Sequence, residues 1–130
     1  MKYLLTSIFV GLCLLITGGC ATKNRMTGND RDSHGCISSA GYTWSEVRQS
    51  CIRIFEEGVR LNNSDDPQAT LAAYAVFSAN NDSVELFLPE KDKHPVLARR
   101  DDCWSDKDYV LCNENGRMCL LYKGKIIFCN

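Results

Sequence analysis

The chain has 130 residues, of which 45% are hydrophobic, and a formal net charge of −1 at pH 7. This length suits one small domain, and the near-neutral charge excludes a basic stripe that binds nucleic acid by neutralising phosphates. The chain has eight cysteines, and whether they bind metal, react or form disulfides depends on the compartment, because disulfides persist in oxidising, exported environments.

The first nineteen residues predict a signal peptide. Lys2 precedes an apolar run over residues 3–16, and small residues lead from there into Cys20. This order is typical of a secretory signal, and the run is shorter than the roughly 20 residues that a membrane span needs. Residues 16–20, Ile-Thr-Gly-Gly-Cys, also resemble a bacterial lipobox, in which the cysteine is lipidated and becomes the first mature residue. An ordinary signal peptide that is cut near Ala21 is the alternative.

The lipobox resemblance implies where the protein resides. It implies a diacylglyceryl thioether and palmitate on Cys20, which anchor the chain to a bacterial membrane, and Ala21 resembles signals for the outer membrane. We therefore expect a cell-envelope lipoprotein with its domain in the periplasm or at the cell surface. Residues 20–34 contain almost nothing that builds a core and predict a flexible polar tether. Residues 35–130 then form a single disulfide-rich β domain. Without Lys2, fourteen Lys plus Arg stand against sixteen Asp plus Glu, a net charge of −2.

The stretch from Cys36 to Cys51 predicts a short helix inside a local disulfide loop. Thr43 and Glu46 fit a capping box, with Thr43 as the N-cap. We therefore expect a helix from about Trp44 to Ser50, with Trp44 facing inward. Cys36 and Cys51 are the natural local pair around it.

The remaining segments predict hairpins. Apolar residues alternate with charged ones on both sides of Glu56-Glu57-Gly58, which suggests a first hairpin. Residues 71–78 and 84–88 predict a second around a turn at 80–83, and turns at Asn115-Gly116 and Lys123-Gly124 predict two more. The fold class is therefore mostly β: a small antiparallel barrel or sandwich of hairpins with one short N-terminal helix, stapled by disulfides. Both faces of the C-terminal strands are apolar, so we expect both to be covered.

Six cysteines remain once the signal peptide and the lipid anchor are set aside, and an even number predicts three disulfides. They are Cys36, Cys51, Cys103, Cys112, Cys119 and Cys129. The turn at Asn115-Gly116 places Cys112 opposite Cys119, and the turn at Lys123-Gly124 places Cys119 opposite Phe128. Side-chain parity therefore favours Cys112–Cys119 and leaves Cys103–Cys129. A one-residue bulge in the last strand would change this register.

Catalytic and metal-binding patterns are absent from the sequence. It contains no Gly-x-Ser-x-Gly elbow, no phosphate-binding glycine loop and no His-Glu-x-x-His motif, so we expect no enzyme, no catalytic residue, no metal and no cofactor. Zinc would need close cysteine pairs or interleaved histidines, whereas His34 and His94 stand apart. The acids Asp101, Asp102, Asp106 and Asp108 lack the glycine turn of a calcium loop and predict a solvated loop. A hydrolase that uses loop carboxylates is left as a further hypothesis.

A strand rhythm with a Val-x-Leu-x-Leu core runs from Val76 to Arg100, and residues 122–126 and a final Cys129 follow it. In these features residues 71–129 resemble the membrane-bound C-type lysozyme inhibitor family. The resemblance implies a small, exported, often lipidated β-barrel that blocks lysozyme. That family inserts a Ser-x-Ser-Gly loop and a Lys-Gly loop into the lysozyme cleft. Here residues 99–105 read Arg-Arg-Asp-Asp-Cys-Trp-Ser and residues 113–116 read Asn-Glu-Asn-Gly, so both loops differ.

Residues 36–44 carry the pattern Cys-x-x-Ser-Ala-Gly-Tyr-x-Trp. It resembles a motif of uncharacterised exported bacterial proteins and implies no activity. Together these features predict an envelope lipoprotein that acts as a binding module, with C-type lysozyme or another envelope protein as partner and no nucleic acid. The alternative is a structural or interaction lipoprotein whose partner is an unknown envelope protein or peptidoglycan.

For the lysozyme contact we predict the loop from Arg99 to Asp108, with help from the turn at residues 114–117. The candidate residues are Arg99, Arg100, Trp104 and Lys107. One of the cations would meet the catalytic carboxylates of lysozyme, and Trp104 would anchor the contact, because aromatic residues and arginine carry most hot spots. In the alternative, Trp104 packs inward beside Cys103 and the charges keep the loop in water.

Overall fold

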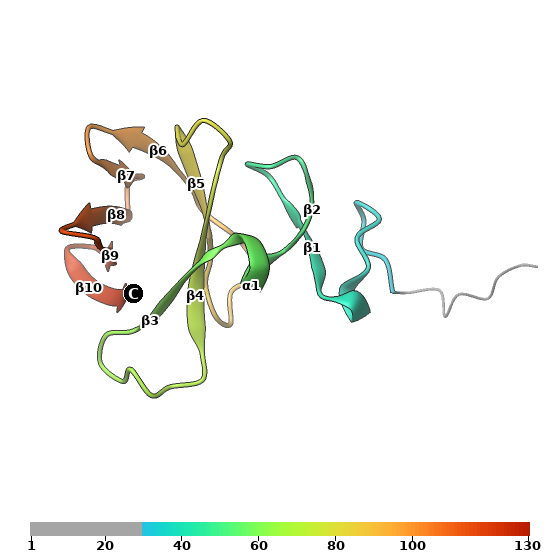
Figure 1. Ribbon diagram of the computed structural model, residues 1–130, viewed down its shortest axis with the longest axis horizontal. Coiled ribbons are helices and arrows are strands. Elements are labelled where there is room, and N and C mark those ends of the chain that lie inside the picture. Colours follow the sequence, from blue (N-terminus) through green and yellow to red (C-terminus); the bar gives the residue numbers. More distant parts are fainter. Residues whose placement is uncertain (1–29) are drawn as a thin grey trace, which may run out of the picture.

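The computed structural model describes residues 30–130 as a closed antiparallel barrel with a small hairpin packed against its side (Figure 1). Eight strands form the barrel, and two further strands form the hairpin. The predicted mostly β, disulfide-stapled fold is confirmed, in its barrel form. The predicted signal peptide, the lipidated Cys20 and the first part of the tether lie outside the described residues.

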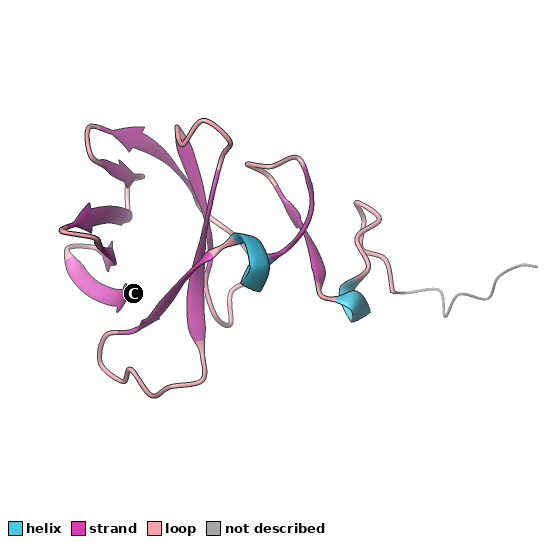
Figure 2. Ribbon diagram, in the orientation of Figure 1, coloured by secondary structure: helices cyan, strands magenta, loops and turns pink. Residues whose placement is uncertain are grey.

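The hairpin comes first in the chain, and the barrel strands follow in order. The hairpin consists of β1 (Tyr42–Ser45) and β2 (Ser50–Arg53), with the 3-10 helix η1 (Ser38–Ala40) before it and the single-turn helix α1 (Ile54–Glu57) after it. The barrel strands are β3 (Val59–Asn63), β4 (Ala72–Phe77), β5 (Ser83–Phe87), β6 (Val96–Arg100), β7 (Cys103–Ser105), β8 (Tyr109–Glu114), β9 (Arg117–Tyr122) and β10 (Lys125–Cys129). Consecutive strands pair, and β10 pairs with β3 to close the ring. Figure 2 shows both helical turns in the N-terminal part.

Alternation of apolar residues along the strands builds the barrel core. In β8, Tyr109 and Leu111 are buried, whereas Val110 and Cys112 are only partly covered, because successive side chains point to opposite faces. The buried cluster inside the barrel comprises Leu61, Ala73, Ala75, Val84, Leu86, Leu88, Leu97, Trp104, Tyr109, Leu111, Met118, Leu120 and Phe128. An eight-stranded barrel is just wide enough for side chains to fill it. The interior is therefore a packed core, and binding surfaces have to be sought outside it.

A second, smaller core joins the hairpin to the outer wall of the barrel. Val76 and Phe87 of β4 and β5 pack against Ile52 of β2, and all three are buried. The partly buried residues Val47, Ile54 and Tyr74 surround them. The hairpin thus covers the outer face of β4 and β5, which explains why side chains on both faces of β5 are buried.

The predicted helix from Trp44 to Ser50 is wrong. These residues belong to β1, β2 and the turn between them, and Trp44 pairs with Cys51 across the hairpin. A capping box describes only local hydrogen bonds. The burial of Ser45 and Ile52 against the barrel wall instead suits the two-residue period of a strand. The single helical turn α1 forms later, where the Gly58 amide donates to the Ile54 carbonyl oxygen at 2.7 Å.

The predicted hairpin around Glu56-Glu57-Gly58 is also wrong, because α1 leads the chain there from the hairpin to the barrel. β2 pairs with β1, while β3 pairs with β4 and β10. The predicted hairpins at residues 80–83, 115–116 and 123–124 are confirmed. Asn115 and Gly116 both have positive φ angles, 54° and 82°, which a two-residue turn of this kind requires.

Three disulfides staple the described domain, and one of the three predicted pairs is right. Cys36–Cys51 forms as predicted, but Cys103–Cys112 and Cys119–Cys129 replace the predicted Cys112–Cys119 and Cys103–Cys129. The cause is a bulge in β10. Ile126 pairs with Leu121 but Phe128 pairs with Leu120, so Ile127 is an extra residue and Cys129 falls opposite Cys119.

The two barrel bridges also occupy the closer cross-strand positions. Cys112 pairs in register with Cys103 on one side and with Cys119 on the other. The two-residue turn makes Cys112 and Cys119 a hydrogen-bonded pair, in which the Cα atoms lie about 5.5 Å apart. The two bridges that form have Cα–Cα distances of 4.5 Å and 4.2 Å. These are close to the roughly 4.5 Å of a non-hydrogen-bonded pair.

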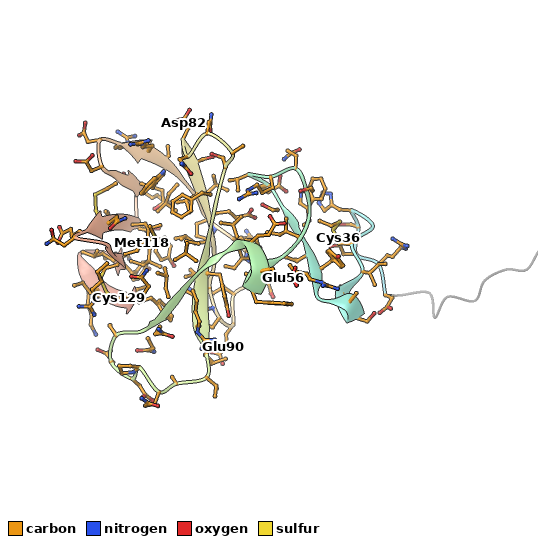
Figure 3. The ribbon with its side chains drawn as sticks, viewed as in Figure 1. Cys36, Glu56, Asp82, Glu90, Met118 and Cys129 are labelled. Atoms are coloured by element: carbon orange, nitrogen blue, oxygen red, sulfur yellow. A yellow bond between two sulfur atoms is a disulfide. The ribbon has the colours of Figure 1, made fainter. Side chains whose placement is uncertain are left out.

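The barrel has two ends, each with its own set of turns. Because neighbouring strands run in opposite directions, the turns at residues 78–82, 101–102 and 115–116 share one end, here called the Asp82 end. The connections at residues 88–95, 106–108 and 123–124 share the other, here called the Glu90 end. Figure 3 shows the labelled Asp82 and Glu90 at opposite ends of the molecule.

Residues 30–34, at the end of the predicted tether, contact the hairpin. The Ser38 amide donates to the Asp30 carbonyl oxygen at 2.8 Å, and Arg31 forms a β-bridge with Ile37. The His34 ring stacks on Trp44 with 4.2 Å between ring centroids. The described fold therefore begins a few residues before Gly35.

Candidate functional site

The predicted contact residues do not form one surface. Arg99 and Arg100 end β6 at the Asp82 end, whereas Lys107 lies in the turn between β7 and β8 at the Glu90 end. All three side chains are exposed. The predicted loop from Arg99 to Asp108 is in fact two tight turns joined by β7, so its residues point to opposite ends of the barrel.

Trp104, the predicted anchor, lies inside the barrel. It is 9% exposed, and its indole Nε1 donates to the Asn81 carbonyl oxygen at 2.8 Å. Phe77 meets the indole edge-to-face at 4.9 Å, and the Arg99 guanidinium lies 5.7 Å from its ring centroid. The alternative prediction, in which Trp104 packs inward, therefore describes its placement. Trp104 closes the core at the Asp82 end. A cavity of about 270 Å³, lined by Trp104, Phe77, Arg99 and Met118 among others, opens there.

The turns around this cavity are held in defined conformations. Asn81, Asp101 and Asn115 all adopt left-handed backbone conformations, with φ of 60°, 55° and 54°. The Arg99 amide donates to the Asp82 carbonyl oxygen at 2.8 Å, which ties the first turn to β6. The exposed charged residues at this end are Arg99, Arg100, Arg117, Asp82, Asp101, Asp102 and Glu114. Charges of both signs therefore lie at the end of the barrel where the Trp104 cavity opens, and Arg99 lines the cavity itself.

The outer face of β8, β9 and β10 carries an apolar groove. Its volume is about 640 Å³, and Val110, Leu121 and Ile126 line it together with Cys112 and Cys119 of the two bridges. The expectation that these strands are covered on both sides is wrong: no described segment covers this face, and Ile126 is 46% exposed. The bulge moves Phe128 to the inner face, where it is buried.

A third cavity, here called the interface cavity, lies between the hairpin and the barrel wall. It has a volume of about 480 Å³, and Trp44, Glu85 and His94 line it together with charged residues. Glu85 is only 1% exposed, and Ser45 Oγ donates to its Oε2 at 2.7 Å. Sequence reasoning missed this site. A usable signal was present, because Glu85 interrupts the apolar run Val-Glu-Leu-Phe-Leu over residues 84–88.

A fourth cavity of about 390 Å³ lies at the Glu90 end, where Tyr109 meets lysines of the β5–β6 connection and acids of the β7–β8 turn. Burial raises the pKa of the Tyr109 hydroxyl above its ordinary value of 10.0, and the neighbouring Tyr122, Asp106 and Asp108 raise it further. The Asp106 carboxylate accepts from the amides of Asp108 and Tyr109 at 2.8 Å and 2.6 Å. The Asp106 carboxylate therefore orders this turn.

Neither the reactive side chains of residues 30–130 nor any similarity to known proteins assigns a function to the chain. Residues 30–130 contain no group of three or more metal-ligating side chains, and their six cysteines are all in disulfides. Over the same residues, every helix is too short or too polar to cross a bilayer. Comparison with protein families, with curated proteins and with solved structures finds no match. A function has to be inferred from the surfaces described above.

Proposed function

We propose that the chain is a cell-envelope lipoprotein whose barrel acts as a binding module, and that C-type lysozyme is the partner to test first. The observation that carries this proposal is the Asp82 end, where three turns with defined left-handed residues lie at the same end of the barrel as the Trp104 cavity. The resemblance of residues 71–129 to lysozyme inhibitors and the three disulfides, which suit an oxidising compartment, support it.

Ordered turns favour binding because they lose little freedom when they enter a cleft. The closed barrel holds both ends of each turn, and the left-handed residues Asn81, Asp101 and Asn115 define the turn shapes. Preorganised loops lower the entropy cost of association. The Asp82 end thus offers rigid projections of the kind that fit an enzyme cleft.

Charge at the Asp82 end suits a cationic enzyme with acidic catalytic residues. Asp82, Asp101 and Asp102 would steer the encounter by opposite charge, and the on-rate would then fall with salt. Arg100 and Arg117 would supply the cations that meet the two catalytic carboxylates of lysozyme. Lys107 is not part of this proposed contact, because it lies at the Glu90 end.

The test is titration of the purified full chain, in detergent, against C-type lysozyme acting on cell-wall suspensions. We expect stoichiometric inhibition, and each of Arg100→Ala and Arg117→Ala should weaken binding at least about fivefold, as interface residues that matter do. Lys107→Ala is the matched control and should leave inhibition unchanged. An unmutated chain that neither binds nor inhibits lysozyme ends the lysozyme proposal.

The anchoring part of the proposal has its own test. Cys20→Ala should move the protein from the membrane fraction to the soluble fraction and remove the mass of the lipid. A Cys20→Ala protein that stays in the membrane with unchanged mass contradicts the anchor, whatever the lysozyme assay shows.

The apolar groove on β8, β9 and β10 favours a second candidate, an interaction lipoprotein with a protein partner in the envelope. Exposed apolar surface of this kind commonly marks a protein contact. A photo-crosslinking residue at Ile126 should then give one defined adduct in cells, and the same residue at Lys123, on the adjacent turn, should not. Equal labelling from both positions rejects this candidate.

A further inference from the structure

We propose that the interface cavity binds a primary ammonium group, carried either by a small amine or by the side chain of a peptide lysine. The cavity lies between the N-terminal hairpin and β5, away from the Asp82 end, so the proposal does not depend on lysozyme binding.

The first observation is a buried carboxylate without a cation. Glu85 is 1% exposed, yet no salt bridge to it forms within residues 30–130. Ser45 Oγ donates to Glu85 Oε2 at 2.7 Å, and the Val47 amide approaches the same oxygen at 3.5 Å. Within residues 30–130 no hydrogen bond to Oε1 forms, and Oε1, unlike His94 Nδ1, is not fully sealed from solvent. Buried charges are normally paired, so Glu85 has capacity for a positively charged donor.

The second observation is an orphaned imidazole nitrogen in the same cavity. His94 Nδ1 is buried and has no hydrogen-bond partner within the described part of the chain. The imidazole packs against Phe87, with 4.3 Å between ring centroids, which holds the ring in place. When Nε2 carries the proton, Nδ1 accepts a hydrogen bond. Glu85 and His94 both line this cavity, and each has an acceptor atom that receives no hydrogen bond from residues 30–130.

The walls of the cavity favour a cation over an anion. Trp44 lines the cavity, but the His34 ring already stacks on its indole, so the preference for a cation comes from the carboxylates. Glu46 and Asp92 add two carboxylates at the rim, against the single ammonium of Lys93. An ammonium group has three donors and no acceptor. It therefore matches two empty acceptors in a net acidic cavity better than a carboxylate or a neutral group does.

Two simpler explanations account for only part of these observations. Anchoring of the hairpin explains the hydrogen bonds to Glu85 Oε2 but leaves Oε1 and His94 Nδ1 without a role. Lys93 is the internal cation that would compete with a ligand. Its side chain is exposed and forms no ion pair among residues 30–130.

The experiment follows the fluorescence of Trp44 in the full chain with the substitution Trp104→Phe. The chain has two tryptophans, so Trp44 is then the only one that remains. n-Butylamine represents a free amine, Nα-acetyl-lysine methylamide represents a peptide lysine, and Nα-acetyl-norleucine methylamide is the neutral control. We expect a saturable change with at least one ammonium probe and none with the neutral control. Calorimetry on the chain without Trp104→Phe should agree.

The variants separate binding from folding. Glu85→Gln should weaken binding about thirtyfold or more, as loss of one partner of a buried charge pair does, while Glu90→Gln, outside the cavity, should change nothing. If Glu85→Gln does not fold, His94→Phe replaces it, since that variant keeps the ring against Phe87 and removes Nδ1. Lys93→Met should bind as tightly as the parent chain or more tightly.

The two ammonium probes distinguish the sources. Binding of n-butylamine alone indicates a small amine, and binding of the lysine amide alone indicates a peptide ligand. Failure of both probes overturns the proposal, as does equal binding of the neutral control. Binding that appears only after Lys93→Met also overturns it, because Lys93 would then be the resident cation.

Discussion

The N-terminal hairpin and the barrel reach stability by different means. In the barrel, every strand has two hydrogen-bonded neighbours and the side chains share one core of thirteen buried residues. The hairpin has two strands, a core contact of three buried residues with the barrel wall, and one disulfide. We therefore expect the barrel to unfold as one cooperative unit, whereas the stability of the hairpin should depend on a few contacts.

A small number of hydrogen bonds and ion pairs hold the hairpin to the rest of the chain. Arg48 Nε donates to the Phe77 carbonyl oxygen of β4 at 2.5 Å, and Arg48 also pairs with Glu57 at 3.3 Å. Ser45 Oγ donates to Glu85 of β5. Loss of one such contact should loosen the hairpin without unfolding the barrel, because the barrel core lies on the other side of the wall.

The largest expected effect is on the barrel. Leu111→Ala removes a fully buried side chain from the core and should lower the free energy of unfolding by about 4 kcal/mol, since the cavity adds to the lost burial. Urea unfolding measured by circular dichroism checks this. Leu121→Ala, on the outer face of the adjacent strand, is the control and should cost clearly less; equal losses would contradict the barrel arrangement.

The second effect should be confined to the hairpin. Cys36→Ala with Cys51→Ala opens a loop with a sequence separation of 15, which on the chain-entropy model costs about 3 kcal/mol. Hydrogen exchange should show amides of β1 and β2 losing protection while those of β8 and β9 keep theirs. Uniform loss across both regions would show that hairpin and barrel unfold as one unit.

A smaller effect should follow from Ser45→Ala. Ser45 is fully buried, and its hydroxyl donates to Glu85. The substitution leaves this buried carboxylate oxygen with only the longer bond from the Val47 amide, at a cost of about 2 kcal/mol. Ser50, the exposed residue opposite it in the hairpin, provides the matched control. The melting temperatures of Ser45→Ala and Ser50→Ala are compared by thermal unfolding. Equal values would contradict a stabilising role of the Ser45–Glu85 hydrogen bond.

The smallest effect concerns alkaline pH and the barrel end. The pKa of Tyr109 lies above 10.0 in the folded chain because of burial and nearby acids. The folded state therefore holds its proton longer than the unfolded state. The contribution of Tyr109 to the free energy of unfolding is therefore complete below about pH 10 and is lost as the pH rises through the folded pKa. Tyr109→Phe should flatten this alkaline decline in unfolding free energy, whereas Tyr42→Phe in the hairpin should not.

The features that could be predicted correctly from the sequence lie in short, contiguous stretches. The turn at Asn115-Gly116 and the hairpin at residues 80–83 follow from local backbone preferences, so neighbouring residues suffice to predict them. Cys36–Cys51 was predictable because the two cysteines close a short local loop. The mostly β class followed from strand spacing and the hairpin turns.

Other features could not be predicted from local sequence, because they depend on contacts between residues that are far apart in the chain. The antiparallel strand β7 separates Arg100 from Lys107, since consecutive turns then fall at opposite ends, and closure of the ring places Trp104 in the core. Closure onto β3 also sets β10 with an extra residue at Ile127, which changes the disulfide partners. The barrel wall buries Ser45 and so makes a strand of a segment whose local pattern indicates a helix. Glu85 and His94 line one cavity only because β5, its following loop and the hairpin pack together, a contact that no local pattern contains.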